Sequence, residues 1–110
     1  MTKDYHNLLE NAEISIFERD AENGKLKITD AGWTIDYLEC KGIDLRKDHK
    51  KAEKVGLILN ARNVDLEDGE IFVISDAHSK WQAKDKVELA IAAIITTLID
   101  DENYTSFEVE

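Results

Sequence analysis

The sequence contains no proline and a single cysteine, Cys40. One thiol cannot form an internal disulfide, and it cannot build a thiolate-rich metal site. The longest unbroken apolar run covers only residues 89–95, far short of the roughly 20 residues that a bilayer-spanning helix needs. The first residues also lack the basic start and apolar stretch of a secretion signal. These absences favour a soluble, cytoplasmic protein that does not act in a membrane.

What the chain does contain is enough apolar sequence for one core. It has 110 residues, of which 43% are hydrophobic and 35% are charged. A chain of this length buries about two-thirds of its unfolded surface, which leaves no room for separate catalytic and regulatory domains. The apolar residues come in organised runs, without linkers or repeats. We therefore expect a single domain over residues 1–110.

Acidic side chains outnumber basic ones by 24 to 14, which gives a formal net charge of −10. The charge is unevenly distributed, because residues 87–110 carry six acidic and no basic side chains, whereas residues 25–60 carry six acidic and eight basic ones. This balance disfavours direct binding to nucleic acid or to an anionic membrane. An acidic chain of this kind is expected to bind a basic surface on another protein.

The first third of the chain predicts a short helix and a β-hairpin. Apolar residues spaced by three and four predict an amphipathic helix near residues 3–12. Residues 14–17 are strand-like, and Asn23-Gly24 is a strong turn signal. Lysines then alternate with apolar residues through residues 25–28, which indicates a second strand whose lysines face water.

Two helices are predicted next. Gly32 can take a positive φ, and Asp30 can cap the first turn of the helix that follows. That helix is expected over residues 33–41, with Trp33 packed in the core and Gly42 as a C-cap. A second helix, over residues 47–61, has an apolar stripe with four lysines largely off it, so it carries the main basic patch.

The last third predicts the most buried elements. A β-branched run at residues 70–75 indicates a third strand, pairing with a short strand near residues 64–66. Asp85 has the position of a capping residue and opens a very hydrophobic helix over residues 87–99, the centrepiece of the core. The acidic tail, residues 100–110, is expected to add an edge strand or to be disordered.

These elements together predict an α+β fold. A small antiparallel sheet of three to four strands packs against a hydrophobic C-terminal helix, and two or three further short helices complete the domain.

The stretch KLKITDAGWTIDYLECKG, followed by ILNARNVDLEDGEIFV and an apolar terminal helix, resembles a domain family of phages and bacteria whose function is unknown. The resemblance covers roughly residues 13–100. In that family a strand ends in Leu-Thr-Asp-Asp-Gly and leads into a helix. The corresponding residues here run from Ile28 to Gly32, with Ala31 in place of the second acid. Because this second acid is missing, the resemblance does not favour a catalytic function.

One pattern imitates an active site. Asp30 with Glu39, Cys40 and Lys41 resembles the acid and E-x-K pattern of metal-dependent nucleases, in which carboxylates bind a divalent ion. A minimal nuclease is therefore one alternative function. The pattern falls at a helix end, where Glu39 and Lys41 point to different faces. A solvated helix terminus is the preferred interpretation.

Other polar groups do not form a recognisable catalytic motif. The hydroxyl, carboxylate and imidazole groups of residues 75–79 follow a strand and are typical of a polar turn. The three histidines lack the i, i+4 pairing of a metal-binding helix, and the five glycines form no phosphate-binding loop. We therefore expect a protein that is not an enzyme and uses no cofactor or metal.

Trp81 lies between Lys80 and Lys84 in a segment expected to be an exposed loop, and tryptophan is enriched at interface hot spots. We interpret the chain as a phage or mobile-element protein that occupies the basic surface of a host defence protein that processes nucleic acid. It would act as a nucleic-acid mimic, like an anti-CRISPR or anti-restriction inhibitor. A homodimeric structural or antitoxin-like subunit is a further alternative. The predicted partner-binding residues are Asp65, Glu67, Asp68, Trp81, Asp100, Asp101, Glu102, Glu108 and Glu110.

Overall fold

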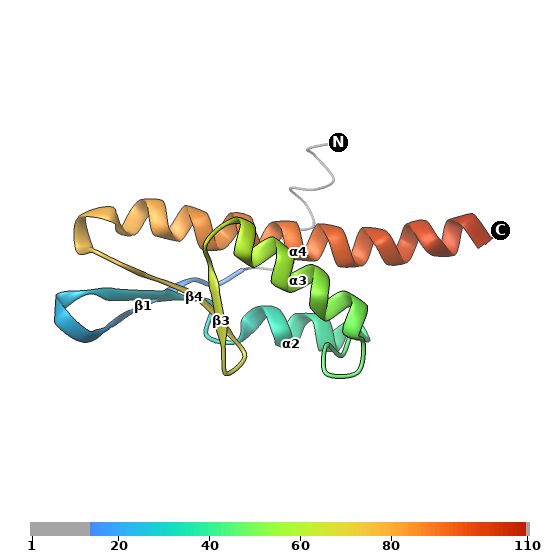
Figure 1. The fold of residues 1–110 in the computed structure, drawn as a ribbon, viewed down its shortest axis with the longest axis horizontal. Helices are drawn as coiled ribbons and strands as arrows, with labels where there is room; N and C mark the ends of the chain where they lie inside the picture. Colours follow the sequence, from blue (N-terminus) through green and yellow to red (C-terminus); the bar gives the residue numbers. More distant parts are fainter. Residues whose placement is uncertain (1–13, 110) are drawn as a thin grey trace.

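The structure, a computed structural model, describes the backbone of residues 14–109 and the side chains of residues 14–99. The helix predicted over residues 3–12 lies outside the described residues. An α+β fold is confirmed, and its elements are shown in Figure 1. They are β1 (Phe17–Asp20), the 3-10 turn η1 (Glu22–Gly24), β2 (Leu26–Thr29), α2 (Trp33–Cys40), α3 (His49–Ala61), β3 (Asp65–Glu67), β4 (Glu70–Ser75), the 3-10 turn η2 (Ala77–Ser79) and α4 (Lys80–Val109).

The predicted hairpin is present, but its first strand begins at Phe17 instead of residue 14. Phe17 pairs with Thr29, the last residue of β2, so the residues before Phe17 have no partner on that strand. The Asn-Gly signal is confirmed, since both residues of the turn have positive φ. Lys27 does not simply face water, because its Nζ atom lies 4.4 Å from the centre of the Phe72 ring.

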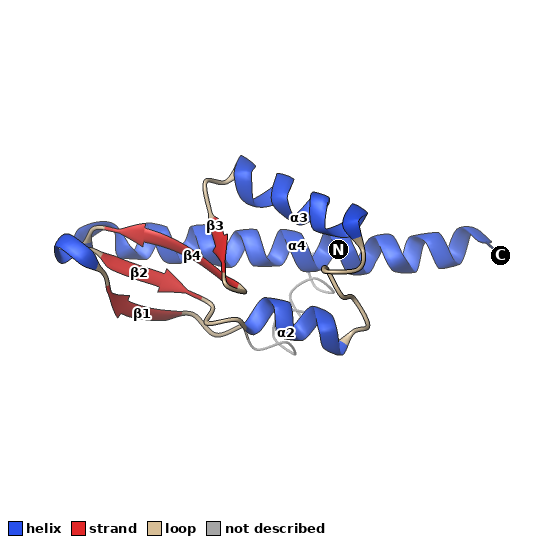
Figure 2. Cartoon of the chain, turned by 60° about the horizontal axis from the view of Figure 1, so that its bottom comes forward, coloured by secondary structure: helices blue, strands red, loops and turns tan. Residues whose placement is uncertain are grey.

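The four strands form one antiparallel sheet in the order β1-β2-β4-β3. β2 and β4 lie side by side although α2, α3 and β3 separate them in sequence. Helix α4 runs along one face of this sheet (Figure 2). Alternate residues on the two central strands, Ile28, Ile71 and Val73, are buried as a consequence. No helix of the described part of the chain covers the opposite face of the sheet (Figure 2).

Helices α2 and α3 begin and end close to where the sequence predicts. Gly32 and Gly42 have φ values of 88° and 85°, a conformation that glycine adopts without steric cost. Trp33 packs against the core as predicted, and its ring stacks on Tyr37 with centroids 5.0 Å apart. Asp48 caps α3 by accepting a hydrogen bond from the Lys51 backbone N–H at 3.1 Å.

The start of α4 differs from the prediction. The helix begins at Lys80, directly after η2, so Asp85 lies inside the helix and does not cap it. The buried Ala83 extends the core stripe by one turn, which explains the earlier start. The helix also continues to Val109, and the predicted edge strand over residues 100–110 is wrong. This segment has no proline or glycine to end a helix that has already formed.

Helix α4 has 30 residues and is therefore about 45 Å long. Its C-terminal end projects beyond α2 and α3 in both views of the fold (Figures 1 and 2). Among the described residues, even this helix lacks an apolar stretch long enough to cross a membrane.

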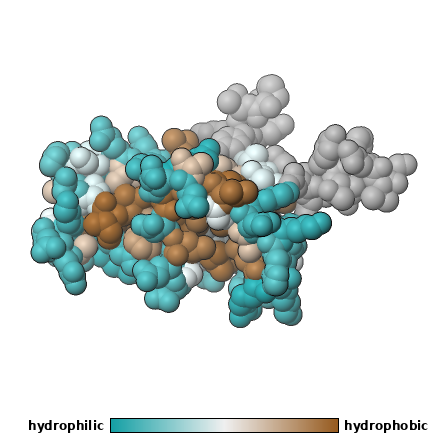
Figure 3. All heavy atoms as spheres, viewed as in Figure 1, coloured by the Kyte–Doolittle hydropathy of each residue, from teal (hydrophilic) through white to brown (hydrophobic). Residues whose placement is uncertain are grey.

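The core lies between α4 and the sheet, and α2 and α3 close its end. Helix α4 contributes the most side chains, which confirms its predicted central role. Apolar side chains also reach the surface, where they gather between hydrophilic ones across the middle of one face (Figure 3). The most deeply buried apolar residues, all 0% exposed, are Leu38, Ile71, Val87, Ala90, Ile91, Ile94, Ile95 and Leu98.

Candidate functional site

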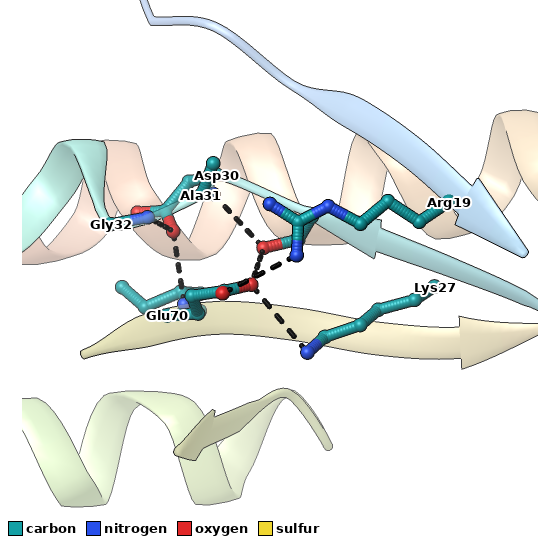
Figure 4. A network of polar contacts seen from close by, with 8 residues as sticks. Arg19, Lys27, Asp30, Ala31, Gly32 and Glu70 are labelled. Atoms are coloured by element: carbon teal, nitrogen blue, oxygen red, sulfur yellow. Dashed lines mark hydrogen bonds and ion pairs between the residues drawn. The ribbon is translucent and has the colours of Figure 1, made fainter. Parts of the chain in front are cut away.

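A network of polar contacts lies at the junction of β2 and α2. Asp30 is 0% exposed. Its Oδ1 atom accepts hydrogen bonds from the backbone N–H groups of Gly32 at 2.9 Å and of Ile71 at 3.0 Å, and Oδ2 accepts one from Thr34 at 2.9 Å. Figure 4 shows the carboxylate between the turn and β4. The predicted capping role of Asp30 is confirmed, and the same side chain also holds the neighbouring strand.

The local sequence explains why these N–H groups converge. Ala31 and Gly32 both have positive φ, 53° and 88°, so the backbone curls around the carboxylate. Thr29 supports the turn, because its Oγ1 atom accepts a hydrogen bond from the Ala31 N–H at 2.9 Å. A left-handed backbone suits aspartate or asparagine better than alanine. Position 31 is also exposed, so an acid there would lie outside the network.

In this geometry both carboxylate oxygens of Asp30 accept hydrogen bonds from backbone N–H groups. A buried carboxylate with three N–H donors is stabilised by charge-assisted hydrogen bonds. Glu39 lies in the last turn of α2, and the helix axis from Trp33 to Glu39 alone spans roughly 9 Å. Lys41 is exposed beyond the helix end, with its Nζ atom 5.5 Å from the centre of the Tyr37 ring. The structure therefore does not bring together the three residues of the nuclease pattern.

Glu70 connects this junction to the open face of the sheet. It accepts a hydrogen bond from Thr29 Oγ1 at 2.7 Å, and its carboxylate lies 3.4 Å from Arg19 and 3.5 Å from Lys27 (Figure 4). The hydrogen bond from Thr29, with the charges of Lys27 and Arg19, lowers the pKa of Glu70 below its usual value. Sequence reasoning missed this cluster, because only the register of three strands brings its members together.

The lowered pKa predicts an acid-sensitive contribution to stability. A carboxyl whose pKa is depressed in the folded state stabilises the fold above its unfolded pKa, about 4.3. The contribution is lost as the pH falls through the lower, folded-state pKa. We expect Glu70→Gln to make stability between about pH 5 and 2 less dependent on pH. Chemical denaturation of both proteins across this range checks it, and parallel pH profiles would contradict it.

The polar residues after β4 form a turn, as the sequence predicts. Ser75 donates its hydroxyl hydrogen to the Asp76 carbonyl at 2.8 Å, and Lys25 pairs with Asp76 at 2.7 Å. The hydrogen bond and the charge of Lys25 lower the pKa of Asp76. His78 is exposed, with its Nε2 atom 4.0 Å from Asp76. Across the described residues, no three His, Cys, Asp or Glu side chains are grouped so that they could hold a metal ion.

The predicted partner-binding residues fall in three places. Asp65 and Glu67 are exposed on β3, and Asp68 is exposed in the turn that follows. Trp81 is 67% exposed, but it lies in the first turn of α4, so the predicted loop is wrong at this position. The backbone at Asp100, Asp101, Glu102 and Glu108 belongs to the projecting end of α4, and Glu110 lies outside the described residues.

The net charge also differs between the body of the domain and the C-terminal end of the chain. Residues 14–99 carry 16 acidic and 13 basic side chains, whereas residues 100–110 carry five acidic and none basic. The body of the domain is therefore close to neutral for its size. Half of the net charge of −10 is carried by the last eleven residues of the chain.

The fold and the capped junction define a small two-layer α+β domain with a Thr-Asp-containing turn between strand and helix. Residues 8–96 match the sequence pattern of DUF1828, a domain of unknown function. The chain belongs to this family, which confirms the resemblance carried by residues 28–32. No curated protein and no solved structure matches the chain.

Proposed function

We propose that this protein is a non-enzymatic acidic binding protein that occupies the basic surface of a protein that processes nucleic acid. The observation that supports this most directly is the end of α4. It projects from a nearly neutral body, and residues 100–110 carry five acidic side chains and no basic one. The exposed acids Asp65, Glu67 and Asp68 form a second negative patch, on and after β3.

The charge density of this helix end is close to that of a nucleic-acid strand. At a rise of 1.5 Å per residue, the four acids in residues 100–109 of α4 correspond to roughly one negative charge every 4 Å. Phosphates along one DNA strand are about 3.4 Å apart along the axis. The C-terminal end of a helix also carries a partial negative charge from the backbone. The segment therefore has the electrostatic character that a phosphate-binding channel recognises.

We propose further that the source is a phage or mobile element and that the target is a host defence enzyme of the CRISPR or restriction type. These enzymes hold nucleic acid in positively charged channels. Binding of the acidic helix in such a channel would exclude the nucleic acid without any reaction. Inhibition is then competitive and requires no cofactor or metal.

The proposal is tested with a panel of purified CRISPR effectors and restriction endonucleases. DNA cleavage and binding are measured with and without this protein, at about 50 and about 200 mM salt. We expect inhibition of at least one enzyme, with weaker binding at high salt and relief by excess DNA. Failure to bind or inhibit any member of the panel at low salt would overturn the proposal.

Charge reversal locates the binding surface. Asp100→Lys with Asp101→Lys is expected to weaken binding by about tenfold or more, mainly by slowing association. The matched control is Asp20→Lys with Glu22→Lys, which makes the same change in net charge on the exposed β1 to η1 segment. Equal loss in both double variants would show that only net charge matters, and the proposed role of α4 would be wrong.

The nuclease alternative is tested in the same assay without the target enzyme. Plasmid DNA is incubated with the purified protein and Mg²⁺ or Mn²⁺. Glu39→Ala is the informative variant, because Glu39 is exposed and its removal is expected to leave the fold intact, whereas Asp30 is part of the structural network. Cleavage that disappears in Glu39→Ala would contradict a non-enzymatic function.

A further inference from the structure

A second binding feature lies at the other end of α4. A hollow of about 180 Å³ opens between the start of β1 and the first turns of α4. For comparison, an apolar cavity of about 150 Å³ accommodates benzene. The volume therefore matches one aromatic ring. The hollow is lined by Ile16, Phe17, Glu18, Ile28, Lys80, Trp81 and Lys84.

The walls of the hollow are apolar, and its rim is cationic. Ile28 is buried at 2% exposure and Trp81 stands at the surface at 67%. The Nζ atoms of Lys80 and Lys84 lie 5.5 and 5.4 Å from the centre of a Trp81 ring, within the range of cation–π attraction. Tryptophan is enriched at interface hot spots, and an exposed one beside an apolar hollow is suited to anchor a partner.

The two lysines are not equivalent. Lys80 pairs with Glu18, with N to O distances of 3.2 and 3.4 Å. Lys84 has its ring contact with Trp81, but no carboxylate lies within ion-pair distance of it among residues 14–99. A ligand that brings a carboxylate to the rim would complete this pairing without breaking an existing one.

We propose that this hollow binds an aromatic side chain from an acidic segment of a partner protein. The ring fills the hollow against Trp81, Ile16 and Ile28, and a neighbouring carboxylate pairs with Lys84. A protein segment is the favoured occupant because Trp81, at 67% exposure, and the cationic Lys84 lie at the solvent-facing side of the hollow, where they complement an aromatic ring flanked by carboxylates. The site is independent of the proposed acidic helix end, since it lies at the opposite end of α4 and has the opposite charge.

The proposal is tested with three capped tripeptides, Glu-Phe-Glu, Glu-Ala-Glu and Lys-Phe-Lys. Two-dimensional NMR follows the indole N–H signals of the two tryptophans. We expect Glu-Phe-Glu to shift the Trp81 signal and to leave Trp33, which stacks on Tyr37, unchanged. The other two peptides should bind at least about tenfold more weakly, since each lacks either the ring or the carboxylates. Equal binding of all three would overturn the proposal.

Variants of the full chain separate this site from general charge effects. Lys84→Glu should weaken Glu-Phe-Glu binding about tenfold, and Trp81→Ala should abolish it. Lys86→Glu is the matched control, because it makes the same charge change two residues away and does not line this hollow. Equal loss in Lys84→Glu and Lys86→Glu would contradict the proposal. Phenylacetate binding as tightly as the peptide would overturn a protein partner in favour of a small aromatic acid.

Discussion

Replacing Asp30 with alanine is expected to lower the free energy of unfolding by about 3–5 kcal/mol. The substitution leaves three backbone N–H groups, those of Gly32, Thr34 and Ile71, without their acceptor inside the fold. Each buried donor that loses its partner costs about 1–3 kcal/mol. For a domain of this size the loss corresponds to a fall in Tm of more than about 10 °C. Urea denaturation followed by circular dichroism measures it.

Two further variants make this result specific. Asp30→Asn keeps the shape of the side chain and the Oδ1 acceptor for Gly32 and Ile71, but places an NH₂ group against the Thr34 N–H, so a smaller loss is expected than in Asp30→Ala. Asp20→Ala removes an exposed carboxylate from β1 and should change stability by less than about 0.5 kcal/mol. A loss below about 1 kcal/mol in Asp30→Ala would show that water or a rearranged turn replaces the carboxylate.

The second large effect is expected in the middle of α4. Ile91→Ala should cost about 2–5 kcal/mol, because it opens a cavity in the core. Leu89→Ala, two residues away, should cost less than about 0.5 kcal/mol. Ile91 is 0% exposed and Leu89 is 63% exposed, so the pair compares the two faces of one helix. Thermal and urea denaturation of both variants checks the prediction.

An equal loss in the two variants would contradict the orientation of α4. If Leu89→Ala were costly and the loss depended on protein concentration, Leu89 would be buried in a self-assembled form. Light scattering across the same concentrations would then report the assembly. That result would favour the alternative of a self-associating subunit.

Several features of the fold could be predicted from the sequence because their signals are local. The turn at Asn23-Gly24, the glycines at positions 32 and 42, and the β3 to β4 turn at Asp68-Gly69 all have positive φ in the structure. Each is a residue type that adopts this conformation at low cost. The capping role of Asp30 was accessible for the same reason, since its partners Gly32 and Thr34 lie within four residues.

Other features depend on tertiary contacts that no local pattern encodes. The capping-box spacing at Asp85 is present in the sequence, but α4 begins five residues earlier, because Ala83 already packs in the core. Glu70 forms its ion pairs with Arg19 and Lys27 only because the strand order β1-β2-β4 places the three residues side by side. The hollow beside Trp81 likewise joins three distant segments of the chain. The predicted role of the acidic residues in binding stays a prediction.

The two hydrogen bonds between Asp30 and Ile71 also bear on the order in which the domain folds. Ile71 accepts a hydrogen bond from the Asp30 N–H at 3.0 Å through its carbonyl, and donates its own N–H to the Asp30 side chain at 3.0 Å. The two residues are 41 positions apart. During synthesis, the residues of α2 therefore leave the ribosome before Ile71, the residue that anchors Asp30 to β4. We therefore expect the α2 junction to form late in folding, when β4 inserts beside β2. The Ile71 amide should then exchange with solvent only when the whole domain opens.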